Sequence, residues 1–191
     1  MSENQKNPPT GGQAGRQPAF GGVRRRGALH LPIGTALPAL TLPSTAGRDV
    51  DLGEVAMAQH VVLFFYPGDR QGQVYPELAG CTPEACAFHA HGETLCGAGA
   101  AVFGVSLQST PRQRVFVQRE GLALEMLSDE QEQLTRDLGI PVWTSRCGDR
   151  FVDRVTLVFA RGRGLARVIR DPTPEAHAGH ALEALRALPP R

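Results

Sequence analysis

Residues 60–66, HVVLFFY, are apolar after the first position and rich in β-branched and aromatic side chains. A run in which polar residues do not alternate with apolar ones is typical of a strand that is covered on both faces. Residues 100–107, AAVFGVSL, form a second run of this kind. Two strands buried on both faces predict a sheet with helices packed on each side, which restricts the chain to the α/β folds.

The other segments alternate between strand-like and helix-like patterns, as such a sheet requires. A small hairpin around PSTAG precedes the first buried run, and an antiparallel pair around RGRG precedes the last helix. The expected strands span 38–42, 48–52, 60–66, 100–107, 124–127, 154–160 and 164–170; the expected helices begin at Thr82 and span 109–121, 128–139 and 174–188. We therefore predict a thioredoxin-like α/β fold: a mixed central sheet flanked by helices, with an N-terminal β-hairpin.

The composition fits one domain, because 191 residues of which 41% are hydrophobic can bury one apolar core. Residues 1–27 combine Pro, Gly and polar residues without periodicity, so we expect a disordered tail followed by a single domain at 28–191. The net charge of +1 argues against a nucleic-acid partner. No window holds the roughly 18 apolar residues of a membrane span and no secretory signal stands out, so we expect a cytoplasmic protein without a membrane partner.

Four unevenly spaced cysteines argue against a disulfide scaffold and predict thiols with individual tasks. Cys81 precedes Thr-Pro-Glu, a helix-start signal with Thr82 expected as N-cap and Pro83 as first helical residue. The backbone N–H groups and the dipole at a helix start favour an anion, so we expect the pKa of the Cys81 thiol to fall from about 8.5 to about 3.5–7.5. The alternative is a buried cysteine that packs as a small hydrophobe. Gly80, which permits close approach, favours the reactive thiol.

His89 and His91 lie near Cys81 and Cys86 in the sequence, which suggests a metal site as an alternative. Their spacing does not match the usual paired zinc ligands, and a single helix cannot bring Cys81 and His91 to one tetrahedral centre. The chain has no Cys-x-x-Cys motif, which disfavours a thioredoxin-type oxidoreductase. We therefore expect neither a metal nor an organic cofactor.

Several segments together carry a family resemblance. VVLFFYPGDR and GCTPEACAFHAH are followed in order by AAVFGVSLQS, LEMLSDEQEQLTRDLGI and RVTLVFARGRGLARVI, so the match covers residues of about 32–188. The chain resembles a peroxiredoxin, in particular the bacterioferritin comigratory protein or peroxiredoxin Q-like branch. The resemblance implies an antioxidant enzyme that reduces hydrogen peroxide and organic hydroperoxides and is recycled by thioredoxin or a similar dithiol protein.

The resemblance also implies roles for three residues. Cys81 matches the peroxidatic cysteine, which attacks the peroxide and becomes a sulfenic acid, and Cys86 matches the resolving cysteine that closes an intramolecular disulfide. Arg154 matches the family arginine whose guanidinium holds the thiolate and the peroxide oxygens; without the resemblance it would be a solvent-facing charge at a strand end. On an intact helix, Cys86 lies about 7.5 Å along the axis from Cys81 and is rotated by roughly 140°, too far for a disulfide. We therefore predict that oxidation unwinds the first helical turn.

The chain departs from the family pattern in the loop before Cys81. Pro67 follows FFY as in the family, but it lies fourteen residues before Cys81 instead of seven. Leu78 stands three residues before Cys81, where the family has Thr or Ser. Thr82, Tyr75 or a backbone group would have to replace the missing hydroxyl, and Pro76 could shield the thiolate in place of Pro67.

Three further residues keep two interpretations each. Trp143, with Pro141, resembles the family segment beside the active site, where its ring could shield the pocket; core packing is the alternative. Cys96 is expected to pack beside the buried strand at 100–107, with a backup resolving role as the alternative. Cys147 lies in the polar segment TSRCGDR and is expected at the surface, where it could form a mixed or intermolecular disulfide or stay idle.

We thus expect a monomeric thiol peroxidase. Two alternatives remain at this point: a non-enzymatic redox sensor on the same fold, in which oxidation of Cys81 alters a partner contact, and a Cys/His metal-binding domain.

Overall fold

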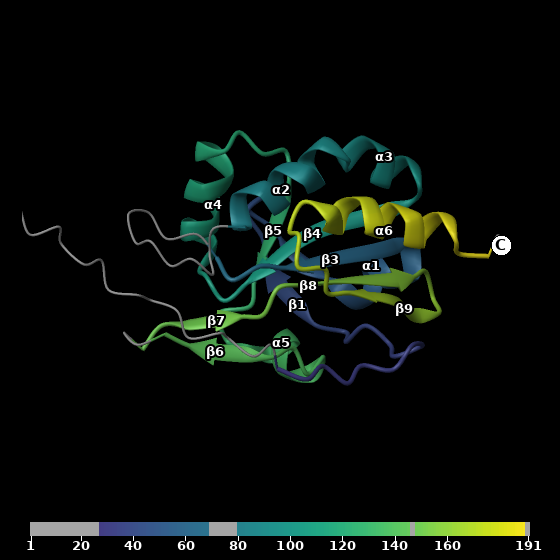
Figure 1. The fold of residues 1–191 in the computed structure, drawn as a ribbon, viewed down its shortest axis with the longest axis horizontal. Coiled ribbons are helices and arrows are strands. Elements are labelled where there is room, and N and C mark those ends of the chain that lie inside the picture. Colours follow the sequence, from purple (N-terminus) through teal and green to yellow (C-terminus); the bar gives the residue numbers. More distant parts are fainter. Residues whose placement is uncertain (1–26, 69–79, 146–147, 190–191) are drawn as a thin grey trace, which may run out of the picture.

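The computed structural model describes residues 27–68, 80–145 and 148–189, and its centre is a five-stranded sheet (Figure 1). In spatial order the strands are β5 (Glu125–Ser128), β4 (Ala100–Ser106), β3 (His60–Phe65), β8 (Val155–Ala160) and β9 (Gly164–Ile169). Strands β3, β4 and β5 are parallel to one another. Strand β8 is antiparallel to both β3 and β9, so the sheet is mixed, as predicted.

Alternate residues of β3 face two separate apolar cores. Val62 and Phe64 belong to the core that holds side chains of α2 (Cys81–Ala90), α3 (Gly92–Gly97), α4 (Thr110–Arg119) and α6 (Ala176–Arg186), and Figure 1 shows α2, α3 and α6 together on one side of the sheet. Val61, Leu63 and Phe65 belong to the core on the other side, together with α1 (Leu52–Ala58) and α5 (Gln133–Asp137). In the described part of the chain, no helix combines the length and the apolar character needed to cross a membrane.

The two predicted hairpins are present. Strands β1 (Thr41–Pro43) and β2 (Asp49–Asp51) pair antiparallel, with Leu42 opposite Val50, and both side chains are buried. Strands β8 and β9 form the second antiparallel pair around the turn at 161–163. Together with the mixed sheet and its helices on both sides, these hairpins confirm the predicted thioredoxin-like fold.

The structure differs from the prediction in several short elements. Helix α1 begins at Leu52, where a strand end was expected, because the carboxylate of Asp51 accepts a hydrogen bond from the Glu54 N–H (3.0 Å) and caps the helix. Helix α5 begins at Gln133 and not at 128, because the Asp129 carboxylate accepts hydrogen bonds from the backbone of Leu134 and Thr135. The sequence analysis did not predict α3, nor the small antiparallel pair β6 (Val142–Thr144) and β7 (Arg150–Val152).

Candidate active site

Cys81 lies at the edge of the sheet where β3 ends and β8 begins, and its side chain is only 2% exposed. Its thiol donates a hydrogen bond to the carbonyl oxygen of Gly68, three residues beyond β3 (Sγ to O, 3.3 Å). Nη2 of Arg154 donates a hydrogen bond to the same sulfur (3.4 Å). Segments 13 residues before and 73 residues after Cys81 in the sequence therefore meet at one sulfur atom.

Helix α2 begins two residues earlier than predicted, at Cys81 instead of Pro83. Gly80, not Thr82, is the N-cap, because the Glu84 N–H donates to the Gly80 carbonyl (3.1 Å) and Cys81 already has helical geometry. Pro83 is therefore the third helical residue, still inside the first turn, where no backbone N–H is needed. Packing requires glycine at position 80, because a Cβ there would overlap Pro174 Cγ and lie 3.1 Å from Arg154 Nη2.

Arg154 directly precedes β8, as predicted, and its guanidinium bridges two side chains of α2. Nη1 pairs with Oε2 of Glu84, and Nη2 reaches Cys81. The Arg154 side chain is 9% exposed, so its charge lies inside the protein and acts on both neighbours with little screening by water. The structure thus rules out the alternative of a solvent-facing charge at a strand end.

The sequence analysis used Glu84 only as a helix-start residue, but its side chain is fully buried beside Arg154. Burial raises the pKa of Glu84 from 4.5 to about 8, although the positive charge of Arg154 lowers it; the charge of Glu175 adds to the increase. His177, on α6, is also fully buried, and its Nδ1 lies 3.4 Å from Glu84 Oε1. The three-residue spacing of Glu84 from Cys81, which places both on one face of a helix, was the available signal for Glu84.

The charge environment of Cys81 differs from the sequence-based expectation. Burial raises the pKa of the Cys81 thiol above its usual value, Arg154 lowers it, and the negative charge of Glu84 raises it further. The expected decrease in the pKa is therefore wrong for this arrangement, because Cys81 belongs to an apolar core and loses more hydration than the helix start and Arg154 replace. When Glu84 is protonated, the charge of Arg154 acts on the sulfur without this competing anion.

The described cysteines are thiols and differ in exposure. Cys86, five residues after Cys81 on α2, is exposed, whereas Cys81 is buried. Cys96, on α3, is also exposed, so the expectation that it packs beside the buried strand is wrong: Leu95, and not Cys96, faces the core there. Cys147 lies outside the described residues.

The remaining predicted residues lie at different distances from the sulfur. Pro67 is buried and precedes Gly68, and Thr82 is half-buried next to Cys81 on α2. Trp143 stacks on Phe151 (ring centres 4.5 Å apart) and packs against the core that contains Cys81. Tyr75, Pro76 and Leu78 lie outside the described residues.

The histidines close to Cys81 in the sequence interact with backbone groups. Nδ1 of His89 accepts a hydrogen bond from the Ala123 N–H (3.0 Å), and Nδ1 of His91 lies 2.9 Å from the Ala87 carbonyl oxygen. Within the described residues, no group of three or more His, Cys, Asp or Glu side chains has an arrangement that could hold a metal ion.

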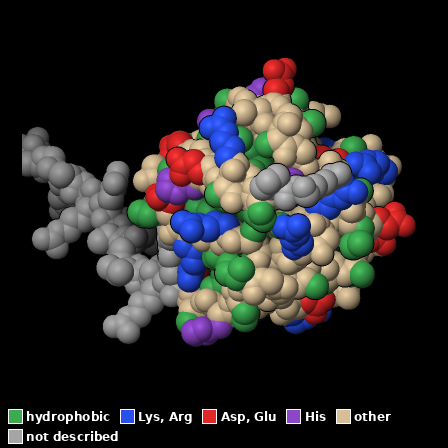
Figure 2. Space-filling view, turned by 90° about the vertical axis from the view of Figure 1, so that its right-hand side faces the viewer, with side chains coloured by type: hydrophobic (Ala, Val, Ile, Leu, Met, Phe, Trp, Pro, Cys, Tyr) green, Lys and Arg blue, Asp and Glu red, His purple; other side chains and the backbone are tan. Residues whose placement is uncertain are grey.

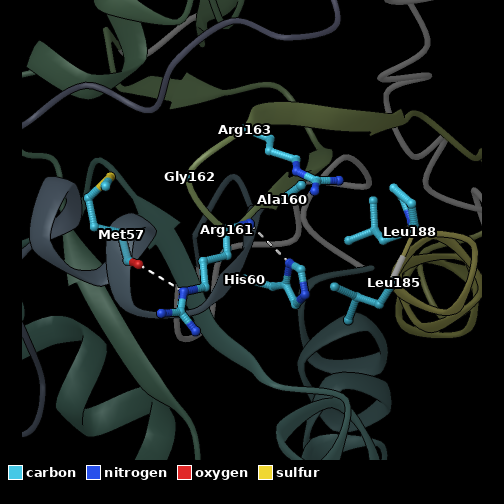
Figure 3. Close-up of a pocket in the computed structure, with 9 residues that line it drawn as sticks. Met57, His60, Ala160, Arg161, Gly162, Arg163, Leu185 and Leu188 are labelled. Atoms are coloured by element: carbon cyan, nitrogen blue, oxygen red, sulfur yellow. Dashed lines mark hydrogen bonds between the residues drawn. The ribbon is translucent and has the colours of Figure 1, made fainter. Parts of the chain in front are cut away.

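A surface hollow of about 540 Å³ lies at the opposite end of β3 from Cys81 (Figure 3). His60, Arg161, Leu185 and Leu188 are among its lining residues; Nε of Arg161 donates to the Met57 carbonyl, and its backbone N–H donates to His60 Nδ1. Figure 2 shows the face at this end, where basic side chains are spread among apolar ones. Neither Cys81 nor its hydrogen-bond partners Gly68 and Arg154 lie among the lining residues, so the hollow is separate from the thiol site.

Comparison with known proteins gives consistent matches. Residues 33–163 match the AhpC/TSA family. The chain is 33% identical to peroxiredoxin Q, chloroplastic, of Suaeda salsa over 157 residues, which cover 81% of this chain and 68% of that protein. Its fold matches the crystal structure of peroxidoxin BcpB from Mycobacterium tuberculosis with a TM-score of 0.71 and 29% identity, covering 84% of this chain and 100% of that chain.

A second solved structure is the Xanthomonas campestris bacterioferritin comigratory protein, which was studied for alkyl peroxide reduction in trapped intermediate and ligand complexes. It matches with a TM-score of 0.67 and 26% identity, covering 83% of this chain and 96% of that chain. These matches favour a peroxidase over a redox sensor or a metal-binding domain. They agree with the fold, and the chain therefore belongs to the AhpC/TSA family, in the peroxiredoxin Q and bacterioferritin comigratory protein branch, and is a thiol-dependent peroxidase.

Proposed function

We propose that Cys81 is the peroxidatic cysteine of this peroxidase and that Arg154 stabilises its thiolate. The thiolate attacks one oxygen of the hydroperoxide and the O–O bond breaks. The bonding electron pair leaves on the second oxygen, which takes up a proton and departs as water or alcohol, and the sulfur becomes a sulfenic acid. The hydrogen bond from Arg154 Nη2 to Cys81 Sγ carries this proposal (3.4 Å). A guanidinium has five N–H donors in a fixed plane, so it can contact the sulfur and the peroxide oxygens together.

Cys86 is proposed as the resolving cysteine. Its thiolate attacks the sulfenic sulfur of Cys81, an S–S bond forms, and the hydroxyl group leaves as water after protonation. Cys86 is exposed while Cys81 is buried on the same helix, so the first turn of α2 must unwind before the two sulfur atoms can meet. The resulting disulfide would then be open to attack by a thioredoxin-like dithiol protein, which returns both cysteines to thiols.

The substrates proposed are hydrogen peroxide and organic hydroperoxides. The apolar surroundings of Cys81 suit an alkyl group, and the connection of the Xanthomonas campestris protein with alkyl peroxide reduction supports this class. Residues proposed to support the site are Thr82, Pro67, Pro76, Tyr75 and Trp143. We also propose a monomeric, cytoplasmic protein without metal, organic cofactor, nucleic-acid or membrane partner, in which a disordered tail (1–27) precedes a single domain (28–191).

The test is hydroperoxide consumption with a thioredoxin system, combined with mass mapping of disulfides after a single equivalent of hydrogen peroxide. Cys81→Ser should abolish consumption. Cys86→Ser should still form a sulfenic acid at Cys81 in one turnover but lose sustained turnover. Cys96→Ser replaces the other exposed, described cysteine and is the matched control, expected to behave as the parent.

Several outcomes would contradict the proposal. If Cys81→Ser still consumes hydroperoxide, another group is the nucleophile. A bridge from Cys81 to Cys96 or Cys147 in the oxidised parent would reassign the resolving cysteine. Slow, stoichiometric oxidation without turnover would indicate the redox sensor, and bound zinc or copper in elemental analysis would indicate the metal-binding domain.

A further inference from the structure

A buried histidine lies behind the Arg154–Glu84 pair. His177 is in the first turn of α6, and three groups surround its ring: Nδ1 is 2.9 Å from Thr156 Oγ1 and 3.4 Å from Glu84 Oε1, and Nε2 is 3.0 Å from the Asp171 carbonyl oxygen. Glu84 therefore lies between two basic side chains, with Arg154 at Oε2 and His177 at Oε1. Among the described residues, Oε1 accepts no conventional hydrogen bond.

The hydrogen bonds determine where His177 carries its protons. A backbone carbonyl can only accept, so Nε2 must carry a proton to bond with Asp171. In the neutral ring, Nδ1 is then a bare acceptor that faces Thr156 and Glu84. A protonated Glu84 can donate to this nitrogen, and an imidazolium can donate from it to the Glu84 carboxylate. Nδ1 has Thr156 Oγ1 as its hydrogen-bond partner at 2.9 Å, and Glu84 Oε1, at 3.4 Å, is close enough to share a proton with the same nitrogen.

The charges of the buried groups give this shared proton a role in forming the thiolate. With the proton present, the Glu84–His177 pair has no net charge, and the Cys81 thiolate balances Arg154. Without it, Arg154 would have to balance both the Glu84 carboxylate and the thiolate, which leaves one net negative charge inside the protein. An uncompensated buried charge is far less favourable than a balanced pair.

We propose that His177 is a positioning residue that holds a proton together with Glu84 and thereby allows Cys81 to become a thiolate in a buried site without net charge. The inference rests on the proposed role of Cys81 and Arg154. The raised pKa of Glu84, about 8, agrees with it, because the carboxyl group then keeps a proton at neutral pH. Two other charged groups act on the pair: the charge of Glu175 also raises the pKa of Glu84, and Asp171 interacts electrostatically with His177.

Each proton in the reaction has a source and a destination. Because the Glu84–His177 pair already holds its proton, the thiol proton of Cys81 leaves to solvent when the thiolate forms. The thiolate attacks ROOH, the O–O bond breaks, and the products are the sulfenic acid and RO⁻. The pair gives its proton to RO⁻, which leaves as ROH, and Arg154 then balances the Glu84 carboxylate. The site stays without net charge, no other acid is required, and the pair takes up a proton from solvent before the next turnover.

The experiment measures the rate of Cys81 alkylation by iodoacetamide against pH, in a background with Cys86→Ser, Cys96→Ser and Cys147→Ser so that only Cys81 reacts. His177→Gln keeps an amide that can donate to Asp171 but cannot titrate. It should move the midpoint of the profile to higher pH by about one unit, so alkylation at neutral pH slows about tenfold. His180→Gln, at a half-exposed histidine on the same helix, is the matched control and should leave the midpoint unchanged.

The deciding arm is the same substitution in a Glu84→Gln background. Glutamine cannot release or take up the shared proton, so His177→Gln should then leave the midpoint where Glu84→Gln alone puts it. If His177→Gln shifts the midpoint equally with Glu84 and with Glu84→Gln, His177 has only a structural role. If it shifts the midpoint in neither background, the proposed role of His177 is refuted. The readout is Cys81 alkylation and not peroxide consumption, so the two proposals can fail separately. The role of His177 can be refuted while Cys81 remains the peroxidatic cysteine. It can also be supported when Cys81→Ser shows that another group is the nucleophile.

Discussion

Arg154 contacts two ionisable side chains with one guanidinium. Its Nη1 contacts Glu84 and its Nη2 contacts Cys81, and both neighbours are buried. Because arginine presents its donors in a rigid plane, the Glu84 contact also fixes the direction from which Nη2 reaches the sulfur. Lysine could supply the charge at one of these positions but not both contacts at once.

The first prediction concerns this geometry. Arg154→Gln should lower kcat/KM for hydrogen peroxide by about 10²- to 10³-fold, since it removes a preorganised donor from the reacting atoms. Arg154→Lys should give a kcat/KM between those of the parent and Arg154→Gln. The positive charge remains, but lysine cannot contact both Glu84 and Cys81. Steady-state kinetics with a thioredoxin system measure both. Arg161→Gln, at the hollow on the opposite end of β3, is the control and should retain full activity; an Arg154→Lys enzyme as fast as the parent would contradict the argument.

Glu84 makes the stability of the fold depend on pH. Its pKa is raised from 4.5 to about 8 by burial, so between these values the folded state binds more protons than the unfolded chain. Its contribution to stability is therefore fully present below about pH 4.5 and is lost as the pH rises through about 8. Glu84→Gln should flatten this part of the profile of unfolding free energy against pH. Urea unfolding at several pH values measures it, and identical slopes in parent and variant would show that Glu84 does not titrate in this range.

At the scale of the elements, helix α2 holds both proposed redox cysteines but exposes only one of them. Cys81 is in its first turn and Cys86 is halfway along, facing solvent. Forming a bond between them requires the helix start to separate from Arg154 and Pro174, which pack closely against Gly80.

Hydrogen exchange can test whether the start of α2 unwinds on oxidation. After oxidation with hydrogen peroxide, backbone amides at 84–86 should exchange faster, because the unwound turn no longer holds them, while those of α6 should change little. Mass spectrometry of peptides from the oxidised and reduced protein measures this. Cys86→Ser, which cannot form the bond, should show no such increase; the same protection in oxidised and reduced parent would contradict the unwinding.

Gly80 provides a further test of the same element. Gly80→Ala should destabilise the protein by about 1–3 kcal/mol and lower peroxidase activity, because the new methyl group overlaps Pro174 and approaches Arg154 Nη2. Thermal unfolding and kinetics measure the two effects. Gly92→Ala, where a Cβ would meet no atom within 4 Å, is the matched control and should be close to neutral in both. A Gly80→Ala protein as stable as that control would show that the contact can relax freely.

At the scale of the whole molecule, long apolar runs and hairpins marked by a turn sequence could be recognised in the sequence, but other short elements could not. The runs at β3 and β4 and the two hairpins follow from local patterns. Strands β6 and β7 have three residues each, too few for periodicity to show, and α3 has six. Of the site, Cys81 followed from the helix-start signal after it and from the family resemblance, whereas Arg154 followed from the resemblance alone. The contact of Glu84 with His177 did not, because it depends on α6 packing over α2, 93 residues further along the chain.

The N-terminal segment provides the last prediction. We expect removal of residues 1–26 to leave kcat/KM and the melting temperature unchanged within error. A shorter chain that begins at Ile33 should be less stable, because it also loses Gly27, whose carbonyl accepts a hydrogen bond from Arg170 Nη1 (2.9 Å). Kinetics and thermal unfolding of the two truncated proteins measure this. A loss of activity on removing 1–26 alone would assign the segment a part in the reaction.

The alternation of β3 between two cores means that this strand offers two independent routes for engineering. Phe64 stacks on Phe88 of α2 (ring centres 4.3 Å apart), so repacking on that side changes the support beneath the reactive sulfur. Leu63, its immediate neighbour, faces the opposite core and touches none of that support. Substitutions at the odd-numbered positions of β3 can therefore change thermal stability through the far core. Substitutions at the even-numbered positions act on the core that contains Cys81 and can change its reactivity.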